Sequence, residues 1–204
     1  KQLYRNYDMG KNGVQIPSME IVDYPALQYR GWLDDISRGP VPNMDFYKKV
    51  IATYAEYKLN FFNFYTEHVF KLDSCPDIAP TDGLTAQQIK ELEDFAKPYH
   101  IEIFGNQQCL AHAEKTLRIP FYQEMADTKS NYNPGNAQTY RFLNYQLKTV
   151  ANAYQSPFFN INCDETEGLG NGKARAYVDS VGAGYAYAQH IIRVHDILKK
   201  YNKR

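Results

Sequence analysis

The chain has 204 residues, of which 44% are hydrophobic and 23% charged, values that are ordinary for one globular domain with a sizeable core. Lys and Arg together number 23, as do Asp and Glu, so the zero net charge gives no reason to expect nucleic acid or an anionic membrane as a partner. No run of about 18 apolar residues occurs, so we expect no membrane span.

Residues 1–20 are polar and contain glycine, and we interpret them as a lead-in or interdomain linker before a domain over residues 21–204. Residues 27–33 (LQYRGWL) predict a short first strand. Asn43 is placed to cap a helix. The apolar stripe of that helix follows at Tyr47, Val50, Ile51, Tyr54 and Ala55.

The next segments continue the alternation of strand and helix. Residues 59–65 (LNFFNFY) form the nearly continuous apolar run of a strand that is covered on both faces. Thr85 and Gln88 predict a capping box for a second helix, and residues 101–104 (IEIF) predict the third strand. A long loop over about 105–134 follows, and loops of this length are usually functional or disordered.

Two more helices and one strand complete the pattern. A helix with an apolar stripe from Tyr140 to Tyr154 ends before Pro157, and residues 158–162 (FFNIN) predict the fourth strand. The last helix runs over about 184–201. Four consecutive βα units predict a parallel α/β sheet with right-handed crossovers. The pattern leaves open whether this sheet is doubly wound or part of a barrel.

Polar side chains recur where the predicted strands end, which is where parallel α/β folds bind their ligands. They are Arg30 within the first strand, Glu67 and His68 after the second, Asn106, Gln107, Gln108 and His112 after the third, and Asp164, Glu165 and Glu167 after the fourth.

Asp164 and Glu165 form the most informative pair. Neighbouring carboxyls at a strand end point in different directions, so one can stay ionised while the other, against apolar walls, has a raised pKa and donates a proton. The simpler interpretation is that the pair caps the next helix, where acidic residues are favoured. From the dipeptide alone the helix cap is the better explanation.

The other candidates also allow two explanations each. Arg30 either binds a ligand or satisfies a buried acid such as Asp34 or Asp35, because an unpaired charge inside a strand is costly. Glu67 and His68 either line the site or cap a helix. His112 in its loop either belongs to the site or is a surface residue. The glycine-rich residues 168–172 (GLGNG) lack the Lys-Ser/Thr of a phosphate loop and are expected to form a plain turn.

Cysteine and aromatic content add two observations. The three cysteines, Cys75, Cys109 and Cys163, have no metal-ligand spacing and cannot all pair, so neither a disulfide scaffold nor a structural zinc site is expected. Aromatic residues make up 15% of the chain, with 18 Tyr. Tyr suits surfaces that meet sugars, although an aromatic-rich core explains the content at least as well.

The order of these segments resembles the family 20 glycoside hydrolases, the β-N-acetylhexosaminidases. Residues 21–38 (IVDYPALQYRGWLDDISR) are similar to the start of that family's catalytic barrel, with Arg-Gly before Leu-Asp-x-Ser-Arg. Residues 54–70 (YAEYKLNFFNFYTEHVF) and 84–104 resemble the family's next two strands with the helix between them. Residues 133–165, ending in CDE, resemble the stretch that carries the family's Asp-Glu.

The sequence departs from the family pattern in two places. The family's His-x-Gly-Gly before Asp-Glu is here Asn160-Ile161-Asn162-Cys163, and its Asp-x-Pro-Gly-His is here residues 108–112 (QCLAH), where only the His matches. The combination is closer to a divergent branch of single-domain exo-β-N-acetylglucosaminidases.

The resemblance implies substrate-assisted, retaining hydrolysis of terminal N-acetylhexosamine from glycans. It implies Glu165 as the general acid and base, and Asp164 as the residue that orients the 2-acetamido group. Arg30 would bind sugar hydroxyls, and Glu67, Gln108 and His112 would line the pocket. No metal and no organic cofactor is implied, and secretion or a periplasmic location would be usual for such enzymes.

A complete (β/α)8 barrel takes about 250 residues, whereas only the first four βα units are recognisable here. We therefore expect an amino-terminal half barrel whose open edges are covered by the missing half or by a second copy. A non-catalytic carbohydrate-binding or scaffold protein on a degenerate hydrolase fold is the alternative. A flavodoxin-like domain is a weaker one, because no phosphate-binding glycine pattern follows the first strand.

Overall fold

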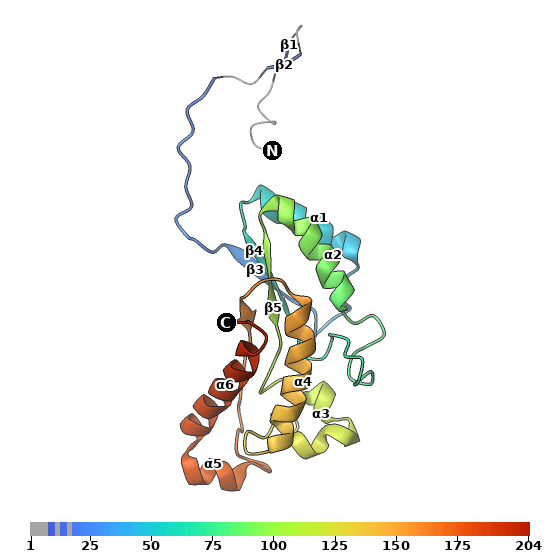
Figure 1. Cartoon of the computed structure of the whole chain (residues 1–204), viewed down its shortest axis with the longest axis vertical. Helices are drawn as coiled ribbons and strands as arrows, with labels where there is room; N and C mark the ends of the chain where they lie inside the picture. The colour runs from blue at the N-terminus through green and yellow to red at the C-terminus, as the bar shows by residue number, and fades with distance from the viewer. Residues whose placement is uncertain (1–7, 11–12, 16–17) are drawn as a thin grey trace.

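The computed structural model of the chain describes residues 8–10, 13–15 and 18–204. Most of the predicted lead-in therefore lies outside the described residues. Its described part contains β1 (Asp8–Gly10) and β2 (Gly13–Gln15), which pair as a short antiparallel ribbon. Residues 18–30 form no helix or regular strand and lead as an extended segment into the body of the protein (Figure 1).

Four parallel strands form the sheet at the centre of the domain. They are β3 (Gly31–Asp35), β4 (Phe61–Tyr65), β5 (Glu102–Asn106) and β6 (Phe159–Asn160), and they pair in sequence order, β3-β4-β5-β6. A doubly wound sheet would reverse its strand order at a switch point. The order found here is that of a partial (β/α) barrel, so the predicted fold class is confirmed and the flavodoxin-like alternative is excluded.

The helices that follow the strands pack against each other as a layer. They are α1 (Met44–Glu56), α2 (Ala86–Ala96), α4 (Ala137–Ala153) and α6 (Ala183–Lys199), with contacts between α1 and α2, α2 and α4, and α4 and α6 (Figure 1). The predicted caps are confirmed: the Asn43 side chain accepts from the Phe46 amide, and Thr85 with Gln88 forms a reciprocal capping box.

The two faces of the sheet differ in what they pack against. On the helix side, Phe62 and Phe64 are fully buried, and the Phe64 ring lies 4.9 Å from that of Tyr47 on α1. On the other side, the rings of Phe61 and Phe104 stack at 5.0 Å, as expected when alternate residues point to opposite faces. In a closed barrel this second face is the interior.

Above the stacked rings, the same face carries a buried amide network. The Asn106 side-chain Nδ2 donates to Asn63 Oδ1 at 3.0 Å, and Asn162 Nδ2 donates to Asn106 Oδ1 at 2.8 Å. Asn106 Oδ1 also accepts from the backbone N–H of Thr66 at 3.1 Å. Buried amides must find such partners because an unsatisfied polar group costs about 1–3 kcal/mol. The network links β4 and β5 to the turn that follows β6.

Several predicted boundaries need correction. The first strand begins at Gly31, so Arg30 precedes it, and the fourth strand is two residues long where five were expected. The loop over 105–134 is ordered and contains α3 (Glu114–Leu117) and the 3₁₀ helix η3 (Pro120–Met125). A further 3₁₀ turn, η2 (Lys97–Tyr99), extends α2, and the short helix α5 (Arg175–Val181) precedes α6. No helix in the described ranges is long and apolar enough to cross a membrane.

The two borders of the sheet are unequal. Along β3, which has a neighbour on one side only, Trp32 and Leu33 are 54% and 43% exposed. Beside β6, the Arg204 amide donates to the Pro157 carbonyl at 2.8 Å and the Phe159 amide donates to the Arg204 carbonyl at 3.1 Å. The β3 border thus exposes a strand edge with large apolar side chains, a surface that proteins normally cover.

A buried histidine ties α6 to the loop after β5. His190 Nε2 lies 3.0 Å from the Cys109 carbonyl oxygen, and its Nδ1 lies 3.1 Å from the Tyr140 hydroxyl on α4. Burial lowers the pKa of His190 to about 4, although the bond to Cys109 opposes the shift. The ring is therefore neutral at pH 7, with Nε2–H donating to the carbonyl.

This histidine should make stability depend on pH. The unfolded chain binds the proton with a pKa near 6.5 and the folded chain with one of about 4, so stabilisation is present above pH 6.5 and is lost as the pH falls toward 4. Between pH 7 and pH 5 we expect a loss of about 2 kcal/mol from this group. Urea unfolding of wild type and His190→Gln at both pH values measures this loss of stability. Equal pH dependence in the two proteins would contradict the role given to His190.

Candidate active site

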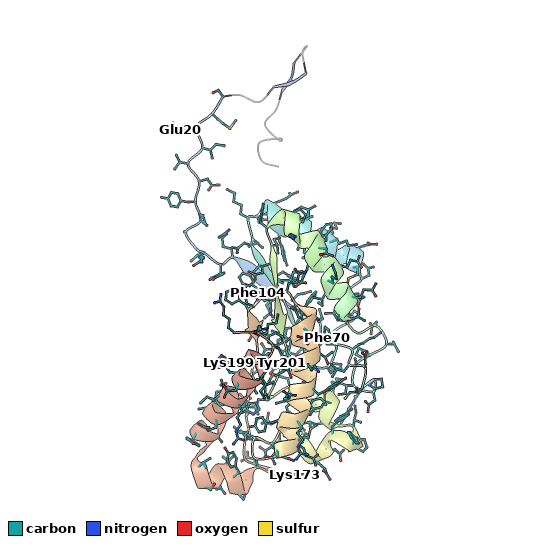
Figure 2. The ribbon with its side chains drawn as sticks, in the orientation of Figure 1. Glu20, Phe70, Phe104, Lys173, Lys199 and Tyr201 are labelled. Atoms are coloured by element: carbon teal, nitrogen blue, oxygen red, sulfur yellow. The ribbon has the colours of Figure 1, made fainter. Side chains whose placement is uncertain are left out.

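Because the four strands are parallel, the segments that follow them lie at one end of the sheet. The segments after β5 and β6 lead to α3 and α5 at that end of the molecule (Figure 1). Figure 2 shows Phe104 on the sheet and Lys173 at this far end. Five of the six predicted site residues gather here: Glu67, Gln108, His112, Asp164 and Glu165.

Gln108 joins three of the four strand-end segments. Its side-chain amide donates to Asp164 Oδ1 at 2.5 Å and to the Tyr65 hydroxyl at 3.0 Å, and its oxygen accepts from the Cys163 amide at 3.2 Å. Gln108 is 2% exposed, so it holds Asp164 from a fixed position. One Asp164 oxygen is thereby oriented, and the other stays free toward His112.

His112 lies among three carboxylates. Its Nε2 is 3.2 Å from Glu165 Oε2 and 4.0 Å from Asp164 Oδ2, while its Nδ1 is 3.9 Å from Glu67 Oε1. The contact with Glu165 has the distance of an ion pair but not the angles of a hydrogen bond, so Nε2 has no hydrogen-bond partner in the part of the chain that the structure describes. Glu67 therefore lies beside one ring nitrogen of His112, and Glu165 lies beside the other.

Glu67 is the carboxyl with a perturbed environment. Its side chain is 8% exposed, and burial raises its pKa, against the Tyr65 hydroxyl that donates to it at 3.2 Å and the nearby charge of Arg38. Asp164 and Glu165, by contrast, have side chains 57% and 67% exposed. The apolar wall expected around one member of the Asp-Glu pair is therefore not supplied by the described residues.

The backbone around the pair is strained. Asn162, Cys163 and Glu165 have φ angles of 52°, 71° and 49°, and His112 has one of 53°. Such left-handed conformations are uncommon for residues other than glycine and concentrate at functional sites. The Tyr187 hydroxyl of α6 donates to the Cys163 carbonyl at 2.9 Å and helps to hold this turn. Asp164 and Glu165 do not cap a helix, since the next helix, α5, begins only at Arg175.

Near Glu67 lie Arg38 and Ser37, which were not singled out from the sequence, and Asp35, which was considered only as a partner of Arg30. Arg38 donates to Asp35 Oδ2 at 2.5 Å and lies 3.4 Å from Glu67 Oε1, and the Ser37 hydroxyl accepts from the Glu67 amide at 2.9 Å. All three lie in the segment 31–38 (GWLDDISR) that carries part of the family resemblance. The motif was therefore a usable signal for a group that positions Glu67.

Arg30, which was predicted to bind sugar hydroxyls, lies apart from the other five predicted site residues. Its guanidinium donates to the carbonyls of Lys58 at 2.8 Å and Leu27 at 2.6 Å, before the strands begin. It pairs with neither Asp34 nor Asp35, which lie at the other end of β3. The charge is satisfied by backbone carbonyls, an arrangement that no sequence pattern indicated.

The glycine-rich turn binds an internal anion. The amides of Gly170 and Ala174 donate to the Asp127 carboxylate at 2.6 and 2.9 Å, and that of Gly172 donates at 3.1 Å. A Cβ at Gly172 would lie 1.7 Å from the Asp127 carbonyl oxygen, so only glycine fits. The turn predicted to be plain thus fastens the loop after β6 to the loop after β5.

Removing the charge of Asp127 should loosen both loops. We expect Asp127→Asn to lower the free energy of unfolding by about 2–4 kcal/mol, because the amide nitrogen would face backbone N–H donors in a buried site. Asp179→Asn, at an exposed position on α5, is the matched control and should change it by less than about 0.5 kcal/mol. Chemical denaturation measures both; equal effects would contradict the role of the turn.

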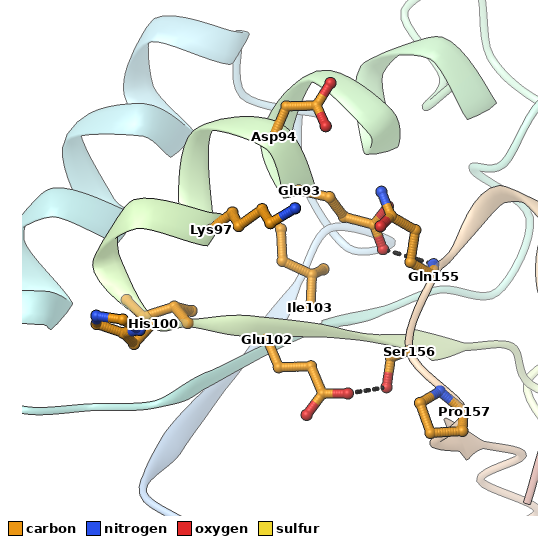
Figure 3. Close-up of a pocket in the computed structure, with 10 residues that line it drawn as sticks. Glu93, Asp94, Lys97, His100, Glu102, Ile103, Gln155, Ser156 and Pro157 are labelled. Carbon is orange, nitrogen blue, oxygen red and sulfur yellow. Dashed lines mark hydrogen bonds between the residues drawn. The ribbon is translucent and has the colours of Figure 1, made fainter.

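A separate hollow of about 340 Å³ lies at the opposite end of β5, between α2 and the segment before β6 (Figure 3). Two of its acids each accept one hydrogen bond: Glu93 Oε1 from the Gln155 amide at 2.7 Å, and Glu102 Oε1 from the Ser156 hydroxyl at 2.7 Å. It lies at the amino ends of the strands and does not join the site described above.

Comparisons with known proteins give the following. No family model matches the sequence. A β-hexosaminidase subunit A2 of Dictyostelium discoideum is 25% identical over 78% of this chain and 32% of its own length. A β-hexosaminidase of Vibrio furnissii is 24% identical over 93% of this chain and 38% of its own length.

Solved structures share the fold. A chitobiase of Flavobacterium johnsoniae superposes with a TM-score of 0.86 at 18% identity, over 99% of this chain and 34% of that chain. A family 20 exo-β-N-acetylglucosaminidase of Vibrio harveyi, in complex with N-acetylglucosamine, superposes with a TM-score of 0.78 at 20% identity, over 99% of this chain and 39% of that chain. The chain thus spans about a third of the length of these relatives.

Proposed function

We propose that this chain, which carries part of a catalytic domain of the family 20 glycoside hydrolase type, contributes the acid and acetamide-orienting residues for the removal of terminal N-acetylhexosamine from glycans. The observation that carries the proposal is the cluster of Glu67, His112, Asp164 and Glu165 at the carboxyl ends of the strands, with Glu165 3.2 Å from His112 and Asp164 held by Gln108. Relatives named β-hexosaminidases support the substrate class.

Glu165 is the proposed proton donor. Its exposed side chain can reach the glycosidic oxygen of a bound sugar, and protonation there lets the bond to the anomeric carbon break with the leaving group as an alcohol. His112 stands behind it with Nδ1 toward Glu67. Glu67 therefore acts as a positioning residue, because its charge favours the ring orientation that turns Nε2 toward Glu165.

Asp164 is the proposed partner of the substrate 2-acetamido group. In substrate-assisted hydrolysis, the acetamide carbonyl oxygen attacks the anomeric carbon and the amide nitrogen becomes positively charged. A carboxylate that accepts from this N–H stabilises the charge as it develops. Gln108 supports the role, since it fixes one Asp164 oxygen and leaves the other available. Glu165, now ionised, then takes a proton from the water that opens the cyclic intermediate with overall retention.

The exposed β3 border supports a second part of the proposal. We infer that further strands complete the barrel, from a longer chain that contains this sequence or from a second polypeptide. Trp32 and Leu33 would then be covered. The completing half would also supply walls around the exposed Asp164 and Glu165.

The role of Glu165 is tested in the completed barrel, which is this chain together with the further strands. We expect Glu165→Gln to reduce turnover of a chitooligosaccharide by about 10²–10⁴-fold, because the proton donor is lost. An aryl N-acetylglucosaminide with an acidic phenol as leaving group should lose less, since its departure needs little protonation. Glu167→Gln, an exposed acid two residues on, is the control and should keep wild-type rates.

Two outcomes would reject this assignment of Glu165. One is a rate unchanged by Glu165→Gln, and the other is an equal loss for both leaving groups. A non-catalytic carbohydrate-binding protein would show saturable sugar binding in both proteins and turnover in neither.

The 204-residue chain on its own provides another test. With half of the pocket wall absent, we expect it to turn over a chromogenic N-acetylglucosaminide at less than about 1% of the rate of a completed barrel, since misplaced groups lose orders of magnitude in rate. Addition of a carboxyl-terminal half barrel from a relative should raise the rate. Turnover by the isolated chain at the rate of the completed enzyme would refute the need for the other half.

A further inference from the structure

The strand-end cluster also has the donor set of a transition-metal site. One ligand atom from each of His112, Asp164 and Glu165 lies within 4.8 Å of the other two. Zinc bonds nitrogen and carboxylate oxygen at about 2.0–2.2 Å, which places tetrahedral ligands about 3.3 Å apart. The separation of 3.2 Å between His112 Nε2 and Glu165 Oε2 already meets this spacing.

The third ligand is close to the required position. Asp164 Oδ2 lies 4.0 Å from His112 Nε2, so it must approach by about 0.7 Å to complete the tetrahedral spacing. Its side chain is 57% exposed and that of Glu165 is 67% exposed, so both can shift by a small rotation. His112, at 15% exposed, is the fixed point of the set.

The surroundings of these atoms match the outer shell of a metal site. His112 Nε2 is buried and has no hydrogen-bond partner within the described residues, whereas Nδ1 faces the Glu67 carboxylate. The Glu67 carboxylate, 3.9 Å from Nδ1, favours by its charge the tautomer that carries the proton on Nδ1 and leaves the Nε2 lone pair for a metal. Gln108 holds Asp164 through Oδ1, which leaves Oδ2 as the ligand atom.

We propose that His112, Asp164 and Glu165 bind a divalent ion of the zinc class, and that this ion inhibits the chain's proposed hydrolase function. One imidazole and two carboxylates suit Zn²⁺ better than Mg²⁺ or Ca²⁺, which prefer oxygen ligands alone. A bound ion would occupy the proton donor and the acetamide partner together. The inhibition rests on the proposed function, whereas the binding does not.

Binding is measured on the 204-residue chain without substrate. We expect Co²⁺, as a spectroscopic substitute for zinc, to give saturable d–d absorption of a four- or five-coordinate site with one ion per chain, and Zn²⁺ to displace it. Calorimetric titration with Zn²⁺ should give the same stoichiometry. Mg²⁺ at the same concentration should not compete.

Variants locate the site. His112→Gln and Asp164→Asn should each abolish the saturable absorption. Glu67→Gln should weaken binding by roughly tenfold, because the charge beside His112 Nδ1 is lost. His195→Gln, which removes an exposed histidine on α6, is the matched control and should bind as wild type. Circular dichroism checks that each variant is folded. Saturable binding that survives both His112→Gln and Asp164→Asn, or no saturable binding by the folded wild type, overturns the proposal.

Inhibition is measured separately in a completed barrel. Zn²⁺ should reduce turnover in proportion to site occupancy, and a chelator should restore it. Occupancy without inhibition would overturn the regulatory part. A completed barrel that binds the ion but hydrolyses no N-acetylhexosaminide would contradict the proposed function and leave the metal site standing.

Discussion

Parallel pairing of the four strands in sequence order is the constraint on which the rest of the structure depends. Because all four strands run in the same direction, residues as far apart in the sequence as Asp35 and Asp164 lie at one end of the sheet. This end of the sheet costs free energy to form, because it brings acids, amides and a histidine together above an apolar layer. The Asn63–Asn106–Asn162 network and Gln108 offset this cost, since each supplies hydrogen-bond partners to the polar groups.

The loops beyond the strands are held by interactions of the same kind. Asp127 with the amides of the glycine-rich turn joins the loops after β5 and β6, and neutral His190 joins α6 to the Cys109 carbonyl. Both use a buried polar group to fix irregular backbone, where helices and strands cannot satisfy the chain themselves. The strained turn that carries Asp164 and Glu165 can persist because these attachments surround it.

The same geometry underlies both proposals for this end of the sheet. A carboxylate behind an imidazole serves proton transfer when the imidazole faces an acid, and it serves metal binding when the imidazole faces an ion. The exposure of Asp164 and Glu165 allows both, because nothing among the described residues closes the pocket above them. The uncovered β3 border and the open pocket are consequences of the same fact, that four strands curve without closing.

Local interactions in the sequence determine the helices and the parallel sheet of this protein. The Asn43 cap, the Thr85–Gln88 box and the apolar periods fix helices whichever way the chain packs, and the βα alternation fixes a parallel sheet. Only the tertiary structure decided which polar residues act together. The sequence favoured Arg30 as a sugar-binding residue over His112 in its loop. In the structure, Arg30 lies before its strand and bonds backbone carbonyls, whereas His112 lies between Glu67 and Glu165. The start of the first strand at residue 31 instead of the predicted residue 27, and contacts across long loops, leave no periodic signal in the sequence.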